Sequence, residues 1–461
     1  RWPCRAPRAN LNLRNRGLGE QRPTQLAVPR HRCGCGRNLT SAGCKLPRQH
    51  RLGKECGDTV RSLPKHPILS GSIESMPASV FEGLKQRAQK LGRRIVPFHV
   101  GDTHLDPPEA ARLGALGFGL GADPDLYAYS PPHGDQEFVS GILAKLASKN
   151  HLSGIGPENV QITMGATHAL SCAVRTAMDP GEHILLLAPH WPLMRGIAHS
   201  CGLRSVEVPF SHILMRDPDA DVVALLESYV TPMTTAIYFA NPNNPDGKVF
   251  TRSELAGIAR VAKRHGLWVI SDEVYENFVY DGSFTSIASL PGMLEQTLTV
   301  FSFSKSYGLA GLRVGYLVGP RRAIQGARKM TNHTVYNVPR AMQAAAMAAL
   351  TTGDPWVAHA RDTYREHRDI AYSLVQAPCE KPEGATYLFL DLSAYCREDT
   401  PDCVCVLERL VDAGMLLTPG GAFGSQYQKW ARMCFTSVEI PELKDAIGRL
   451  NRVLERCAAE R

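Results

Sequence analysis

The segment TTAIYFANPNNPDG, residues 234–247, joins an apolar run of strand-forming residues to a turn dense in Asn and Pro. Runs of this kind that end in such turns are typical of β-strands. The arrangement recurs in LWVISDEVY, residues 267–275, and in TVFSFSK, residues 299–305, where polar side chains again follow apolar ones. These three segments predict three successive strands, each of which ends in a polar side chain that could bind a ligand or take part in catalysis.

The surrounding chain continues the alternation. VQITMG, residues 160–165, HILLLAP, residues 183–189, and residues 204–208 also have the composition of strands, and residues 253–265 have the periodicity of a helix. Strands that alternate with helices favour a parallel or mostly parallel central sheet with helices on both faces, the α/β class. Ligands of such sheets bind at the carboxyl ends of the strands.

Beyond Tyr316 the chain is expected to be mainly helical, which indicates a second, smaller α+β domain. Its expected helices are residues 341–350, 357–376, 402–413 and 441–459, and another is expected at 79–91. The expected division of the chain is 66–125 as an N-terminal arm with part of the small domain, 126–345 as the large domain, and 346–461 as the C-terminal small domain.

Residues 1–65 differ from the rest in composition. They contain fifteen Lys and Arg against three Asp and Glu, whereas the remainder contains 37 and 41. The segment has neither helical nor strand periodicity, so we expect a disordered or spurious extension. Because the remainder is not basic, no nucleic-acid partner is expected.

Composition also narrows the class of protein. The chain has 461 residues, of which 44% are hydrophobic, and no apolar run approaches the roughly 20 residues of a membrane span. The thirteen cysteines are dispersed, which favours a reduced, cytoplasmic protein. Cys33 and Cys35, with His31 and Cys44 nearby, match no standard zinc spacing, so no metal site is expected.

The three strand ends supply complementary groups. The first carries the amide of Asn244, the second the carboxylate of Asp272 and the phenol of Tyr275, and the third the amine of Lys305. Each residue alone has an ordinary structural explanation. Their joint placement at one sheet edge predicts a shared site.

These motifs resemble those of the class I/II aminotransferases, which are fold type I pyridoxal-phosphate enzymes. NPNNPDG is similar to the Asn-Pro turn of that family, SDEVY to its Asp-x-x-Tyr element, and SFSKSYGLAGLR, residues 302–313, to its lysine motif. The resemblance covers nearly all of residues 66–461, in the order of the family.

The resemblance implies roles around the cofactor. Lys305 is implied to bind pyridoxal phosphate covalently and then to shuttle protons, because an amine freed into a cationic site can act as a base. Asp272 is implied to keep the ring nitrogen protonated. Tyr275 and Asn244 are implied to hydrogen-bond the phenolate oxygen of the ring, and Trp191 to stack on the ring, although a core tryptophan is the competing explanation.

The resemblance also implies a phosphate site and a carboxylate clamp. The implied phosphate ligands are Ser302 or Ser304 or both, Arg313, and the helix start at Gly165, Ala166 and Thr167. Arg432 and Gly101 are implied to hold the substrate carboxylate, with Trp191 and Asn244 beside it. Tyr129 resembles a tyrosine that reaches the phosphate of a partner subunit, which implies a homodimer with shared sites.

The chain departs from the family at two places. Asp246 stands where threonine is usual, and Thr167 stands where an aspartate-selective branch has a lysine that meets the distal carboxylate. Arg340, His104, His133 or His168 could replace that lysine.

The expected function is an aminotransferase that exchanges an amino group between an L-amino acid and a 2-oxo acid by a ping-pong mechanism. A pyridoxal-phosphate β/γ-lyase of the same fold remains an alternative. So does an aminotransferase-like DNA-binding regulator, although residues 1–65 contain no helix-turn-helix pattern.

Overall fold

The computed structural model describes residues 67, 69–76, 81–118 and 124–460. Pro67–Arg461 forms one compact unit. The expectations for residues 1–65, including the cluster around Cys33, lie outside the described residues.

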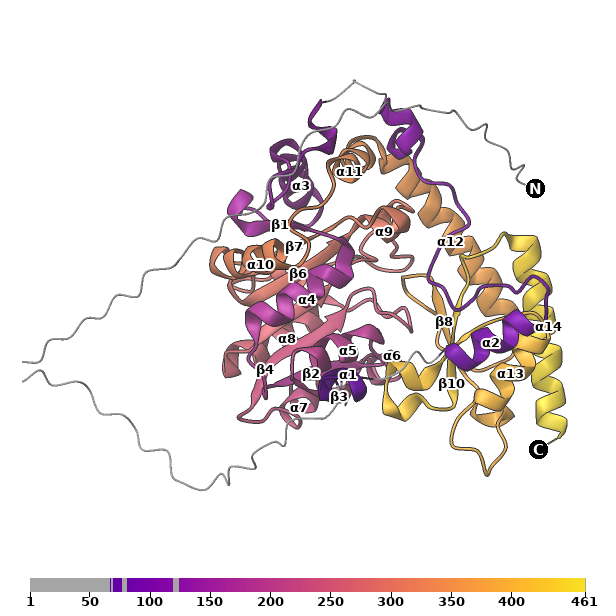
Figure 1. The fold of residues 1–461 in the computed structure, drawn as a ribbon. Coiled ribbons are helices and arrows are strands. Elements are labelled where there is room, and N and C mark those ends of the chain that lie inside the picture. The colour runs from indigo at the N-terminus through magenta and orange to yellow at the C-terminus, as the bar shows by residue number, and fades with distance from the viewer. Residues whose placement is uncertain (1–66, 68, 77–80, 119–123, 461) are drawn as a thin grey trace, which may run out of the picture. The chain divides into compact units, whose positions relative to one another are not determined.

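The larger sheet has seven strands in the order β1-β7-β6-β5-β4-β2-β3 (Figure 1). The pairs that join β2 to β6 are all parallel, whereas β7 runs antiparallel to both of its neighbours. The mostly parallel sheet expected from the sequence is therefore confirmed. Its strands are β1 (Val160–Thr163), β2 (His183–Ala188), β3 (Arg204–Pro209), β4 (Thr234–Ala240), β5 (Trp268–Asp272), β6 (Thr297–Ser302) and β7 (Gly315–Val318).

Helices cover both faces of this sheet, as expected. Successive side chains of a strand point to opposite faces, and in β2 Leu186 packs into one apolar cluster while Leu185 and Leu187 pack into another. The first cluster contains residues of α4 (Gly165–Ala177), α5 (Leu193–Ser200) and α10 (Arg321–Thr334). The second contains residues of α6 (Ser211–Arg216), α7 (Val222–Glu227) and α8 (Arg252–His265).

A smaller antiparallel sheet in the order β8-β10-β9 confirms the α+β part. Its strands are β8 (Tyr387–Asp391), β9 (Thr418–Pro419) and β10 (Trp430–Cys434). The helices that pack around it are α2 (Glu82–Lys90), α12 (Asp354–Leu374), α13 (Val404–Asp412) and α14 (Ile440–Ala459). Helix α2 lies against α13, which brings an early segment of the chain beside the C-terminal part (Figure 1).

The remaining α-helices are α1 (Gly71–Glu74), α3 (Gln136–Lys149), α9 (Phe303–Ser306) and α11 (Arg340–Thr352). The sequence prediction was wrong in one respect near the site, because Lys305 lies in the short helix α9 and not at the end of a strand. The strands β7 to β10 were not predicted either. They lie among the long helices of the C-terminal part, whose periodicity dominates the sequence there.

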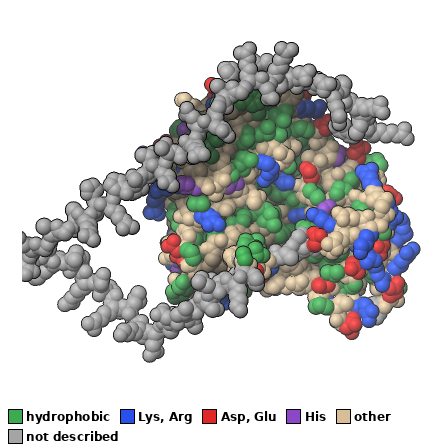
Figure 2. Space-filling model, viewed as in Figure 1, with side chains coloured by type: hydrophobic (Ala, Val, Ile, Leu, Met, Phe, Trp, Pro, Cys, Tyr) green, Lys and Arg blue, Asp and Glu red, His purple; other side chains and the backbone are tan. Residues whose placement is uncertain are grey.

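No helix among the described residues has the length and apolar composition needed to cross a bilayer. The described part of the chain also holds no group of three or more His, Cys, Asp or Glu residues suited to a metal ion. On the face drawn in Figure 2, basic and acidic side chains are interspersed.

Candidate active site

A cavity of about 390 Å³ lies where the two sheets meet. Ala240 and Asp272, the last residues of β4 and β5, line it, as does Ser302 at the end of β6. Its opposite wall includes Tyr387 of β8 and Arg432 of β10. The cavity therefore lies at the carboxyl ends of parallel strands, where ligands of open α/β sheets bind.

Most of the site residues expected from the sequence line this cavity. They are Gly101, Ala166, Thr167, Trp191, Asn244, Asp272, Tyr275, Ser302, Ser304, Lys305, Arg313 and Arg432. Gly165 lies beside the cavity, against Arg313. Tyr129 is not among the lining residues of its own chain, and its side chain is exposed.

Lys305 projects from α9 toward the opposite wall, where its amine donates a hydrogen bond to the carbonyl oxygen of Gly101. Gly101 has no room for a side chain, because a Cβ there would lie 1.8 Å from the hydroxyl oxygen of Tyr387. The backbone of residue 101 can pack this closely against Tyr387 only because it is glycine.

Asp272 is a buried carboxyl group with one oxygen unsatisfied. Its Oδ2 accepts a hydrogen bond of 3.2 Å from the hydroxyl of Tyr238, whereas its Oδ1 has no partner. Burial raises the pKa of Asp272 to about 7. A buried unpartnered carboxyl oxygen on a cavity wall suits a ligand that brings a donor or a positive charge.

Arg432 is a buried cation that no carboxylate of the described residues neutralises. It is 6% exposed, and its guanidinium donates to Asn244 Oδ1 at 3.0 Å, to the carbonyl of His99 at 2.6 Å and to Thr418 Oγ1 at 3.2 Å. Its Nε has no partner. A buried charge without a counterion is costly, so this position suits an anionic ligand.

The contact with Arg432 also orients Asn244. A guanidinium has only donors, so the amide oxygen of Asn244 must face it. The amide NH₂ of Asn244 is thus left to donate elsewhere in the cavity. Tyr275 is buried nearby, and its hydroxyl is hydrogen-bonded to that of Tyr387.

The start of α4 and Arg313 together offer donors suited to a second anion. A helix begins with backbone N–H groups that lack intrahelical partners. A Cβ on Gly165 would lie 2.7 Å from Nη2 of Arg313, and the φ of Gly165 is +73°. Glycine at the first position of α4 thus brings the guanidinium against the helix end. The Oγ of Ser302 accepts from the N–H of Ser304 at 3.1 Å and holds the start of α9 beside them.

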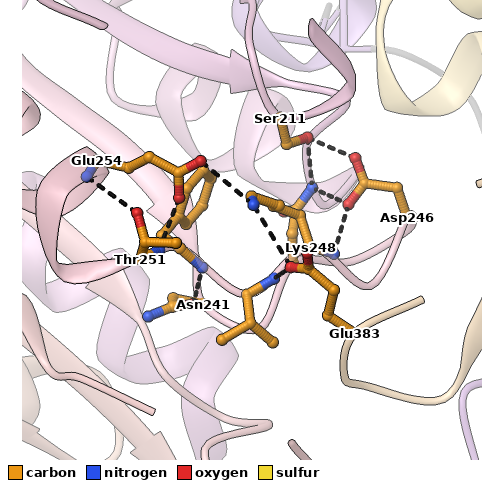
Figure 3. A network of polar contacts seen from close by, with 10 residues as sticks. Ser211, Asn241, Asp246, Lys248, Thr251, Glu254 and Glu383 are labelled. Carbon is orange, nitrogen blue, oxygen red and sulfur yellow. Dashed lines mark hydrogen bonds and ion pairs between the residues drawn. The ribbon is translucent and has the colours of Figure 1, made fainter. Parts of the chain in front are cut away.

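The turn that carries Asn244 is held by buried polar groups (Figure 3). Asp246 accepts hydrogen bonds from the hydroxyl of Ser211, from Nδ2 of Asn243 at 2.8 Å and from the N–H of Lys248 at 3.2 Å. The departure from the usual threonine therefore gives this turn an acceptor for three donors, which holds the backbone on both sides of Asn244 in place.

Lys248 and the start of α8 extend the same network. The Lys248 amine lies 3.2 Å from Oε1 of Glu254 and 3.5 Å from Oε2 of Glu383 (Figure 3). Glu254 also forms a capping box with Thr251 at the start of α8. The turn is thus tied to the helix that follows it.

Sequence reasoning missed several residues of the cavity wall. Tyr238 does not line the cavity but donates to Asp272, and it could have been found, because it lies two residues before the end of β4 and so shares a face with Ala240, which pairs with Asp272. Phe81, Lys85, His99 and Tyr387 carry no comparable local signal. These four residues come from segments that are far in the sequence from the strand-end motifs.

The four candidate replacements for the lysine of the aspartate-selective branch do not line the cavity. Arg340 lies within 3.6 Å of Asp125 and 3.5 Å of Asp135, and His168 contacts Thr334. His104 stacks on His367. None of the four is therefore placed to replace that lysine in the cavity of its own chain.

Comparisons with known proteins agree with this geometry. The family model for aminotransferase class I and II matches residues 93–450. The chain is 31% identical over 402 residues to the aspartate/prephenate aminotransferase of Thermus thermophilus, covering 84% of this chain and 99% of that one. It is 30% identical over 398 residues to aromatic-amino-acid aminotransferase 2 of Thermococcus litoralis, covering 84% and 98%.

Solved structures show the same likeness. The aspartate aminotransferase of Thermotoga maritima superimposes with a TM-score of 0.76 at 28% identity, covering 84% of this chain and 100% of that one. The family match, the curated relatives and the arrangement of cations around one cavity agree with one another. This chain belongs to the aminotransferase class I and II family and is an aminotransferase.

Proposed function

We propose that the chain uses pyridoxal 5′-phosphate to move an amino group between an L-amino acid and a 2-oxo acid in two half-reactions. The observation that carries the proposal is the charge of the cavity wall. Lys305, Arg313 and Arg432 line it, and the one acidic residue among its described lining is Asp272, which has an unsatisfied oxygen.

The residues present fit the cofactor. Arg313 and the first N–H groups of α4 suit a phosphate, and the Oδ1 of Asp272 suits a protonated ring nitrogen. Lys305 is the lysine that lines the cavity from α9, within reach of the opposite wall. When bound, pyridoxal phosphate supplies an aldehyde that takes up the amino group and a ring that withdraws electrons from the substrate α-carbon.

The roles of the protein groups follow from their positions. Asp272 Oδ1 would keep the proton on the ring nitrogen, because the negative charge of the carboxylate makes that protonation favourable. Asn244 Nδ2 and the Tyr275 hydroxyl would donate to the oxygen on the ring. Arg432 would bind the substrate α-carboxylate, with its unpartnered Nε as one available donor. With the substrate so held, Lys305 Nζ would take the proton from the α-carbon and hold it for delivery to the cofactor carbon that takes up the amino group.

The proposal extends to a homodimer. Tyr129 is 81% exposed and packs edge-on against Tyr336, at 4.9 Å between ring centroids. An exposed aromatic pair suits a contact with a second copy of the chain. In that arrangement Tyr129 would reach the phosphate end of the partner's cavity.

The test is the visible absorption spectrum of the purified chain with pyridoxal phosphate, before and after glutamate is added. The wild type should show a band of lysine-bound cofactor that glutamate converts to the pyridoxamine form. Borohydride should attach the cofactor to residue 305. Lys305→Ala should abolish the trapping, whereas Lys329→Ala, at an exposed position on α10, should not.

Failure has two distinct forms. If the wild type binds no pyridoxal phosphate, the cofactor proposal is wrong. If it binds the cofactor but releases pyruvate and ammonia from an amino acid without a 2-oxo acid acceptor, the β/γ-lyase alternative is correct.

A further inference from the structure

One wall of the cavity, beyond Arg432, carries a further cation. Lys85 of α2 lines this wall together with Phe81, His99, Val100 and Leu193. Its amine lies 5.6 Å from the ring centroid of Phe81, and the Phe81 ring lies 5.7 Å from that of His99. The His99 carbonyl in turn accepts the 2.6 Å hydrogen bond from Arg432. Lys85 and Arg432 therefore lie along one continuous wall.

The position of Lys85 follows from the packing of α2. Leu84, the residue before it, is 4% exposed and belongs to the apolar core of the smaller sheet. Consecutive residues of a helix point in directions about 100° apart, so burial of Leu84 turns Lys85 away from that core. The side chain of Lys85 is exposed and forms no ion pair with a carboxylate of the described residues.

Charge at this wall comes from Lys85 and not from His99. Burial, followed by the positive charges of Lys85 and then Arg432, lowers the pKa of His99 to about 4. His99 is therefore neutral near pH 7. Both cations thus act on the same half-buried ring. An anion on this wall would meet two positive charges, with no described carboxylate between them.

We propose that Lys85 is a specificity-determining residue that binds the side-chain carboxylate of a dicarboxylic amino acid whose α-carboxylate is bound by Arg432. The inference rests on the proposed function, because it names the substrate class of that site. Lys85 would then do what the sequence analysis expected of Arg340 or one of three histidines, which is to bind the distal carboxylate in place of the lysine of the aspartate-selective branch. Neutral side chains are the competing class, because Val100 and Leu193 also present apolar surface to the cavity.

Binding of unreactive acids tests the charge directly. Succinate has two carboxylates and butyrate has one, and isothermal titration calorimetry on the full chain with pyridoxal phosphate measures both. The wild type should bind succinate about tenfold more tightly than butyrate, in line with one added charge-assisted hydrogen bond. Lys85→Ala should remove the difference, and Lys85→Arg should keep most of it.

Lys90→Ala is the matched control, because Lys90 is exposed on the same helix and does not line the cavity. It should keep the preference of the wild type. The proposal is overturned if the wild type binds the two acids equally, or if Lys85→Ala retains the preference for succinate.

Half-reaction kinetics supply the second readout. For aspartate and glutamate, Lys85→Ala should lower kcat/KM about tenfold and Lys85→Glu further, while leucine and phenylalanine change by less than about twofold. A uniform loss for all four amino acids would show a merely structural role and overturn the proposal. If no amino acid reacts with the wild type, the proposed function has failed, and the ratio of succinate to butyrate affinity still decides the role of Lys85.

Discussion

Two charged side chains of the cavity are buried without a full set of polar partners. Arg432 is buried with no carboxylate from the described residues beside it, and Asp272 is buried with Oδ1 unpartnered. Both groups are costly in the protein alone. A substrate carboxylate and a protonated ring nitrogen would supply the missing partners. Binding free energy is therefore available at these two residues.

Asp272→Asn gives the sharpest prediction at this scale. In the folded chain without cofactor the pKa of Asp272 is about 7, above the value of about 3.9 in an unfolded chain. The unfolded chain loses this proton first, so the contribution of Asp272 to the free energy of unfolding falls as pH rises from about 4 to about 7. The cofactor-free variant should therefore be more stable than the wild type at pH 8, with a smaller advantage at pH 5.

Urea unfolding at both pH values measures this effect, with Asp219→Asn at an exposed position as the control. An equal difference at the two pH values would contradict the assignment. With pyridoxal phosphate added, the wild type should become more stable than Asp272→Asn, because an amide cannot balance the charge of a protonated ring nitrogen. The half-reaction of the variant should slow by roughly 10²–10⁴-fold.

At the scale of elements, the site depends on how strands end. The turn after β4 presents Asn244 because Asp246 accepts from Ser211, Asn243 and Lys248 beneath it. The end of β6 passes directly into α9, so Lys305 is placed by a helix that begins at the strand terminus. Local polar contacts hold both junctions, those of Asp246 in the first and that of the Ser302 hydroxyl in the second.

Asp246→Ala tests the first junction. It leaves the hydroxyl of Ser211 and the N–H of Lys248 without their acceptor in a buried position, so the free energy of unfolding should fall by about 2 kcal/mol. Asp246→Asn should cost less, because it keeps an acceptor and burial already raises the pKa of this carboxyl. Chemical denaturation measures both variants against Asp219→Ala. A loss as small as that of the exposed control would show that the network does not stabilise the turn.

At the scale of the whole molecule, the cavity combines two sheets and the proposed dimer would add a second chain. Tyr129 is exposed and lies outside the lining of its own cavity. In a dimer with shared sites, a chain that lacks Tyr129 can still use the Tyr129 of its partner. The arrangement can therefore be tested by mixing two defective chains.

Tyr129→Ala and Lys305→Ala should each be impaired alone. After the two are unfolded and refolded together, random pairing should restore about a quarter of the wild-type sites, because each mixed dimer has one complete site. Amino-group transfer from glutamate measures the recovery. Activity that remains the sum of the two separate variants would exclude a shared site.

Much of the fold could be predicted because its signals are local. Apolar runs with polar ends at β4, β5 and β6 depend on neighbouring residues, and so does the helical periodicity of α8. The order of these elements predicted a mostly parallel sheet and one edge where Asn244, Asp272 and Lys305 meet. Strands such as β9 and β10 were missed, since the periodicity of the neighbouring helices dominates the sequence around them.

The sequence by itself therefore determined the class of fold, the family and the residues offered at the strand ends. Only the tertiary structure decided which distant side chains face them. Tyr387 comes from the smaller sheet and Lys85 from a helix anchored by Leu84 in the core of that sheet. Packing between segments hundreds of residues apart leaves no periodic trace in the sequence. The pKa values of Asp272 and His99 likewise follow from burial, which exists only in the folded chain.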